Sequence, residues 1–73
     1  MILKSGDMVY YGPHKATGLL VSRFIRADET YWRYILRSPK PGGAHHFVNE
    51  FDALESKIVK QIQDGHLLHY ARR

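Results

Sequence analysis

The apolar positions of this chain follow one spacing up to about residue 49 and another spacing beyond it. In the first part, short runs rich in aromatic and β-branched residues are separated by turn-forming residues, which is typical of β-strands. In the second part, apolar residues recur every three or four positions, which is typical of one face of an α-helix. The pattern therefore predicts several short strands followed by one helix.

Four strands are expected in the first part of the chain, each bounded by residues that favour turns. Their ranges are Met8–Tyr11, Leu19–Arg26, Tyr31–Arg37 and Ala44–Val48. Residues 14–17 are expected to form a loop, and the polar residues 27–30 have a length that suits a hairpin connection. The segment Pro39–Gly43 is the strongest breaker, because prolines lack the backbone N–H donor and glycines tolerate positive φ.

The single helix is expected over residues 50–64. Asn49 is a favourable N-cap, and Asp52 stands three residues later, as in a variant of the capping box. Gly65 suits the position that follows the C-terminus of a helix. One stripe of this helix is expected to face the core, and it consists of Phe51, Leu54, Ile58, Val59 and Ile62.

The tail, residues 66–73, is expected to be partly ordered, because leucine and tyrosine residues lie within it. Residues 67–70 are expected to add a final strand or an apolar clasp, whereas residues 71–73 are expected to be loose. A length of 73 residues suits a single domain. The expected fold class is β with one α-helix: a small antiparallel barrel or bent sheet of four to five strands packed on a C-terminal helix.

The third expected strand carries most of the candidate binding residues. Its alternation places the more apolar side chains, Trp32, Tyr34 and Leu36, on the face expected to meet the core. The opposite face presents two arginines, and Arg23 of the preceding strand joins them if the register allows. The candidate partner-binding residues are Arg23, Tyr31, Arg33 and Arg37. Arginines among aromatic residues suit a protein interface or phosphate contacts with base stacking, and an ordinary solvated sheet face is the alternative to both.

The net charge of +4 belongs entirely to residues 1–49, which hold seven Lys and Arg against three Asp and Glu. Residues 50–73 are balanced, with four of each sign. A localised positive charge suits an acidic partner. A protein partner is favoured over nucleic acid, with weak nucleic-acid contact kept open, because nucleic-acid modules are usually more basic. Asp28 and Glu29 also lie at the tip of the same expected hairpin.

Catalytic and metal-binding signatures are missing from the sequence. The chain has no cysteine, which excludes a closed cysteine zinc site, and it has neither a nucleophile elbow nor a phosphate-binding glycine loop. The adjacent His45 and His46 are expected to point to opposite faces of a strand. We therefore expect a monomeric binding module, not an enzyme, without cofactor or metal. Its apolar runs, such as Leu19–Val21, are too short to cross a membrane.

Two segments carry a resemblance to SH3-like domains. Gly6–Gly12, followed by Gly18–Leu20, resembles their opening, and Phe47–Leu54 is similar to a last barrel strand that enters a helical turn. The resemblance covers residues 6–54 and implies a small barrel. Modules of this kind contact RNA polymerase, ribosomes or nucleic acid.

The chain as a whole resembles small transcription regulators of lytic bacteriophages that bind host RNA polymerase. This resemblance implies a protein of the host bacterial cytoplasm that binds RNA polymerase, inhibits promoter-dependent initiation and acts as an antiterminator. The alternative is an SH3-like module that binds nucleic acid directly. A small virion or assembly component is a third interpretation, which the sequence does not separate from the first.

Overall fold

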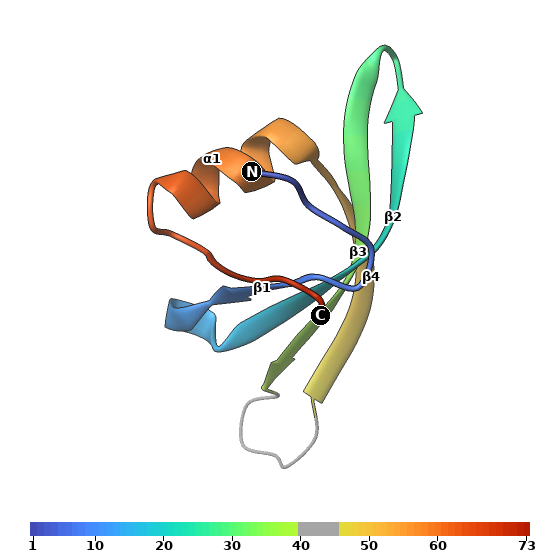
Figure 1. Ribbon diagram of the computed structural model, residues 1–73. Coiled ribbons are helices and arrows are strands. Elements are labelled where there is room, and N and C mark those ends of the chain that lie inside the picture. The colour runs from blue at the N-terminus through green and yellow to red at the C-terminus, as the bar shows by residue number, and fades with distance from the viewer. Residues whose placement is uncertain (40–45) are drawn as a thin grey trace.

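Five antiparallel strands form one bent sheet, and a single α-helix packs on one of its faces (Figure 1). The computed structural model describes residues 1–39 and 46–73. The strands are β1 (Met8–Tyr11), β2 (Ala16–Arg26), β3 (Glu29–Pro39), β4 (His46–Leu54) and β5 (Leu68–Tyr70), and the helix is α1 (Glu55–Gln63). A short 3-10 helix, η1 (Gly12–His14), joins β1 to β2.

The strand order in the sheet is β4-β3-β2-β1-β5. Within the described residues, β4 and β5 form the two edges, so the sheet stays open. Of the two architectures expected from the sequence, the bent sheet packed on a helix is therefore the one that forms. The long β2–β3 hairpin extends beyond the rest of the sheet (Figure 1).

The connections around β2 are shorter than the sequence suggests. The loop expected at residues 14–17 is wrong in its second half, because Ala16 and Thr17 belong to β2 and pair with β1. The turn expected over residues 27–30 contains only Ala27 and Asp28, whose φ angles are 51° and 64°. Two successive positive φ angles give a two-residue turn that follows the twist of the flanking strands, so both strands continue to the turn.

The boundary between the last part of the sheet and the helix is the main correction. The helix expected from residue 50 begins at Glu55, and β4 continues to Leu54. Asn49 is therefore not the N-cap; that position belongs to Leu54, which makes no side-chain cap hydrogen bond. Asp52 does not complete a capping box, because it lies opposite Arg33 of β3. Pairing with β3 outweighs the local helix signals in this segment.

The core lies between the sheet and α1. Its buried members are Leu3, Val9, Leu20, Trp32 and Ile58, with Tyr34, Ala53, Val59, Ile62 and Leu67 packed around them. The expected core positions of Trp32 and Tyr34 are confirmed. Phe51, expected on the helix stripe, lies on β4 and contacts the ring of Tyr34. The breaker segment and the start expected for the fourth strand include residues 40–45, which lie outside the described residues.

A β-bulge interrupts the pairing of β2 with β3. Leu20 lies opposite Tyr34, whereas Ser22 lies opposite Arg33, so Val21 is an extra residue. One extra residue reverses which face the following side chains occupy. Before the bulge Leu20 points to the core, and after it Arg23 points to the same side, opposite Trp32.

Asp7 joins the two ends of the chain. Its carboxylate accepts hydrogen bonds from the backbone N–H groups of Lys4 (2.9 Å) and Arg72 (2.7 Å), and it lies 2.9 Å from Nε2 of His69. The order expected for residues 67–70 is confirmed, because β5 pairs with β1. Residues 71–73 form no strand or helix, but the backbone of Arg72 is held by Asp7.

Candidate functional site

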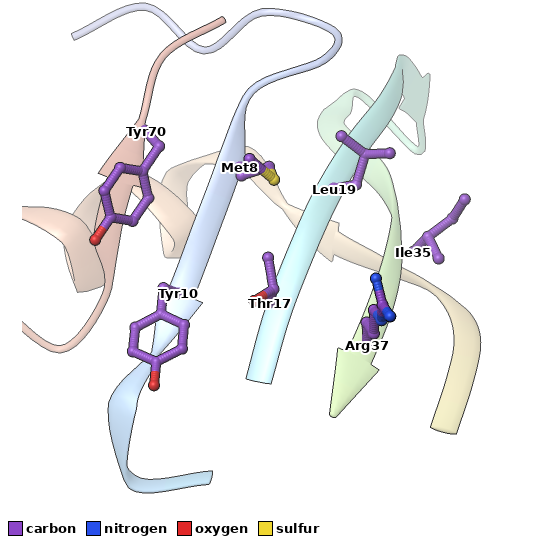
Figure 2. Close-up of a pocket in the computed structure, with 7 residues that line it drawn as sticks. All are labelled: Met8, Tyr10, Thr17, Leu19, Ile35, Arg37 and Tyr70. Atoms are coloured by element: carbon purple, nitrogen blue, oxygen red, sulfur yellow. The ribbon is translucent and has the colours of Figure 1, made fainter. Parts of the chain in front are cut away.

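The face of the sheet opposite α1 is not covered by any helix of the described residues, and we call it the open face. It contains a shallow concavity of about 620 Å³. Seven residues from four strands line this concavity: Met8, Tyr10, Thr17, Leu19, Ile35, Arg37 and Tyr70 (Figure 2). The concavity is open to solvent and is the candidate docking surface of this face.

The strand register arranges these side chains in two rows that cross the sheet. One row runs Tyr70, Met8, Leu19 and Ile35, and the other runs Tyr10, Thr17 and Arg37. Met8 is 42% exposed, Leu19 is 38% exposed and Tyr70 is 53% exposed, although all three are large and mainly apolar. The first row therefore forms an apolar floor with three exposed members, and exposed apolar residues grouped in this way are typical of an interaction surface.

Arg37 stands at one corner of the concavity. It lies opposite Thr17, and Lys15 directly precedes the strand that contains Thr17, so both cations belong to the same end of the sheet. Arg37 forms no ion pair with the described residues. Met8–Leu20 and residues 34–39 contain no Asp or Glu. This end of the open face is therefore basic.

A second group of side chains occupies the opposite end of the open face, on the β2–β3 hairpin. The rings of Phe24 and Tyr31 stack with their centroids 5.5 Å apart. The guanidinium of Arg26 lies 5.2 Å from the Phe24 ring and 5.7 Å from the Tyr31 ring, and that of Arg33 lies 5.3 Å from the Phe24 ring. We call these four residues the aromatic–arginine cluster.

The arginines of this cluster already have acidic partners. Nε of Arg33 lies 3.1 Å from Asp52 and 3.3 Å from Glu50, and Arg26 lies 3.7 Å from Asp52. The hydrogen bond from Arg33 to Asp52, aided by the charges of both carboxylates, raises the pKa of Arg33. Most of the positive charge expected on this face is therefore balanced within the molecule, and Arg37 is the exception among its arginines.

The structure places three of the four candidate residues on the open face. Tyr31 and Arg33 lie in the aromatic–arginine cluster, and Arg37 lies at the other end of the face. Arg23 does not join them, because the bulge at Val21 turns it to the helix side. The expectation that Arg23 extends the arginine face is therefore wrong.

Arg23 instead connects the hairpin to the start of α1. Its Nε donates to Glu55 over 2.8 Å, and the same carboxylate oxygen accepts a hydrogen bond from Nε1 of Trp32, also over 2.8 Å. The hydrogen bond from Arg23 lowers the pKa of Glu55, opposed by burial and assisted by Trp32. These contacts give Arg23 a structural role.

Of the seven residues of the concavity, Arg37 alone was among the candidates from the sequence, so six were missed. Alternation within Met8–Tyr11 was a usable signal, because it puts Met8 and Tyr10 on one side and the buried Val9 on the other. Leu19 lies on the same face as Met8 because the two residues pair across β1 and β2, and this register is not evident from the sequence. Tyr70 had no local signal, because its place depends on β5 pairing with β1.

The described residues hold no group of three or more His, Asp or Glu side chains arranged to bind a metal ion. The expected orientation of His45 lies outside them. Within residues 1–39 and 46–73, no helix has the length and apolar character that a membrane crossing requires. No family model, curated protein or solved structure matches this chain. Its function is therefore inferred from the open face together with the resemblances in its sequence.

Proposed function

We propose that the protein is a transcription regulator that binds bacterial RNA polymerase in the host cytoplasm through its open face. It inhibits promoter-dependent initiation and acts as an antiterminator. The observation that carries the proposal of protein binding is the apolar row Tyr70, Met8, Leu19 and Ile35, whose first three members are exposed and which no described helix covers. The resemblance to small phage regulators supports the choice of partner.

The chemistry of the open face supports recognition rather than catalysis. Tyrosine and arginine are enriched in the residues that dominate binding at protein interfaces, and both line the concavity. A standard interface buries about 800 Å² on each partner. A molecule of this size therefore acts by occupying or bridging surfaces of the polymerase.

Co-purification and transcription in vitro test this function. The tagged full chain is mixed with purified bacterial RNA polymerase, and transcripts are measured on a template with a promoter and a downstream terminator. We expect association, fewer initiated transcripts, and more read-through from complexes that are already elongating. Absence of association together with unchanged initiation and termination would reject the proposal.

A matched pair of variants tests whether the open face is responsible. Leu19→Asp places a charge in the apolar row, whereas Ile25→Asp makes the same chemical change at a residue that is 75% exposed on the helix side of the hairpin. We expect Leu19→Asp to weaken polymerase binding by about tenfold or more, as for a central interface residue, and Ile25→Asp to leave binding unchanged. Circular dichroism confirms that both variants are folded.

Direct binding of nucleic acid is the second candidate, and the aromatic–arginine cluster favours it. Stacked aromatic rings beside arginines suit the bases and phosphates of a single strand. Against this, Asp52 and Glu50 already neutralise Arg26 and Arg33. Fluorescence anisotropy with labelled single-stranded DNA and RNA decides, because binding that falls steeply with salt would support this candidate. No binding at low salt would eliminate it.

A further inference from the structure

The concavity of the open face combines an apolar floor with one cation. Met8, Leu19 and Ile35 lie side by side across three strands, so the floor is wide enough for several apolar side chains of a ligand. The tyrosines at positions 10 and 70 stand on β1 and β5, and Arg37 stands on β3 at the far side of the concavity (Figure 2). The ligand is therefore expected to be apolar along most of its length and acidic at one place.

The charges around the concavity strengthen this expectation. None of the seven lining residues is acidic. Glu50 is the next residue along the row after Ile35. Its carboxylate forms an ion pair with Arg33 over 3.3 Å. Arg37 thus lacks a carboxylate partner among the described residues, and Lys15 adds a second positive charge at the same end of the sheet.

A nucleic acid fits this surface poorly. Its affinity depends on several phosphate contacts, and the concavity offers one arginine. Its bases stack on aromatic rings, whereas the concavity has its two tyrosines on β1 and β5 and only Met8, Leu19 and Ile35 between Tyr70 and Arg37.

A second copy of this chain fits no better. In a two-fold contact the same surface faces itself. The facing concavity would supply no carboxylate, so Arg37 would be buried without an acidic partner, which is unfavourable.

We propose that the concavity binds an acidic, apolar segment of a partner protein, with leucine-like side chains on Met8, Leu19 and Ile35 and a carboxylate paired with Arg37. This deepens the proposed function, and it rests on that function only for the identity of the protein that carries the segment. Hydrophobic burial supplies most of the affinity, and Arg37 selects for acidic sequences.

The direct test is an NMR titration of the full ¹⁵N-labelled chain with two synthetic peptides. One peptide alternates pairs of leucines with glutamates, and its twin carries lysine in place of every glutamate. We expect the acidic peptide to shift the amide signals of Met8, Leu19, Ile35 and Arg37, and the lysine twin to bind about tenfold more weakly or not at all. Equal binding of the twins, shifts centred on α1, or no shifts at millimolar peptide would overturn the inference.

Two charge-neutralising variants locate the selective contact. Arg37→Gln removes the cation of the concavity, and Lys57→Gln removes an exposed cation of α1. Both substitutions lower the net charge by one. We expect Arg37→Gln to weaken binding of the acidic peptide about two- to fivefold, as for an exposed ion pair, and Lys57→Gln to leave it unchanged. Equal effects of the two variants would show that net charge alone is responsible and would overturn the role of Arg37.

The outcomes separate this inference from the proposed function. If the acidic peptide binds in the concavity but RNA polymerase does not co-purify, the inference stands and the polymerase proposal fails. If polymerase co-purifies and Leu19→Asp weakens that binding, but the acidic peptide causes no shifts in the concavity, the polymerase proposal stands and the inference fails. Sedimentation of the free protein adds a further check, because a dimer abolished by Leu19→Asp would make a second copy the occupant and overturn the inference.

Discussion

Leu19 and Leu20 are neighbours in sequence with opposite roles. Leu20 is 1% exposed within the core, whereas Leu19 is 38% exposed on the open face. Because strand side chains alternate, one step along the backbone moves a leucine from the core to the proposed interface. This pair allows stability and binding to be measured separately with the same substitution.

We expect Leu20→Ala to lower the free energy of unfolding by about 2–5 kcal/mol, because it leaves a cavity in the core. Leu19→Ala should change stability by less than about 1 kcal/mol, since the residue is partly exposed, while weakening partner binding. Urea denaturation of both variants, together with the polymerase binding assay, checks this pair. A large loss of stability in Leu19→Ala would show that the open face contributes to the core.

Asp7 is the one charged side chain that is buried among the described residues, with 1% exposure. Burial alone would raise its pKa, but the hydrogen bonds from Arg72 and Lys4 and the contact with His69 outweigh burial and lower it from 3.8. The folded state therefore favours the ionised form. The stabilisation that ionised Asp7 contributes to the fold is fully present above the pKa that Asp7 has in the unfolded chain. It is lost as pH falls through the lower pKa that Asp7 has in the folded chain.

We expect the melting temperature to fall as pH drops below about 4, the range in which an unfolded aspartate takes up its proton. Asp7→Asn should be less stable at neutral pH by about 1–3 kcal/mol, because backbone N–H groups lose an anionic acceptor. The melting temperature of Asp7→Asn should also fall less steeply in acid than that of the unaltered protein. Thermal unfolding of both proteins between pH 7 and pH 2 measures this, and an identical acid decline in the variant would contradict it. Glu55, whose pKa is also lowered, adds to the decline in the same direction.

At the scale of elements, the sequence pattern correctly predicted features that depend on neighbouring residues. The alternation of β3 identified its core face correctly, because a strand presents every second side chain to the same side. The bulge at Val21, the extension of β4 to Leu54 and the pairing of β5 depend on partners distant in sequence. Residues 49–54 contain plausible helix-start signals, yet pairing with β3 makes them a strand.

The candidate site also contains residues that alternation within one strand predicts and residues that only the pairing of distant strands brings together. Tyr31, Arg33 and Arg37 were placed on one face by alternation within β3 alone, and the structure agrees with that placement. Arg23 was misplaced because the bulge precedes it. The apolar row of the concavity was missed because its members come from β5, β1, β2 and β3, and only the strand register brings them together.

The β2–β3 turn offers a prediction for a whole hairpin. Ala27 has a φ of 51°, a conformation that costs free energy for alanine and that asparagine tolerates better. We expect Ala27→Asn to raise the free energy of unfolding by up to about 1 kcal/mol. Ala27→Val should lower it, because a β-branched residue is strained at positive φ. Urea denaturation distinguishes the variants, and equal stability of the two would contradict the turn geometry.

At the scale of the whole molecule, the fold separates charge. Asp28, Glu29, Asp52 and Glu55 gather around the hairpin and the start of α1, where they contact arginines or solvent. The other end of the sheet keeps Lys15 and Arg37. The sequence located the excess charge in residues 1–49, and within the described residues the structure shows that Lys15 and Arg37 of this excess lie at one end of the sheet.

The whole sheet also depends on its last strand. Removing residues 68–73 would leave one edge of β1 unpaired and take two partners from Asp7. We expect this truncation to lower the melting temperature strongly and to remove most of the acid sensitivity that comes from Asp7. Removal of Arg73 alone should have little effect, because this residue forms no strand pairing. An unchanged melting temperature after the longer truncation would show that β5 contributes little.

The carboxylate of Asp7 holds the backbone at residue 4 and at residue 72 together, so the polypeptide is nearly a ring. A circular permutant can use this proximity, with a short glycine–serine linker from residue 73 to residue 1 and new ends between Ala27 and Asp28. Such a chain would begin with β3 and finish with β2, while the neighbours of every strand in the sheet stay the same. The new ends would lie at the hairpin tip, away from the basic end of the open face, which suits them for attaching a label or a surface tether.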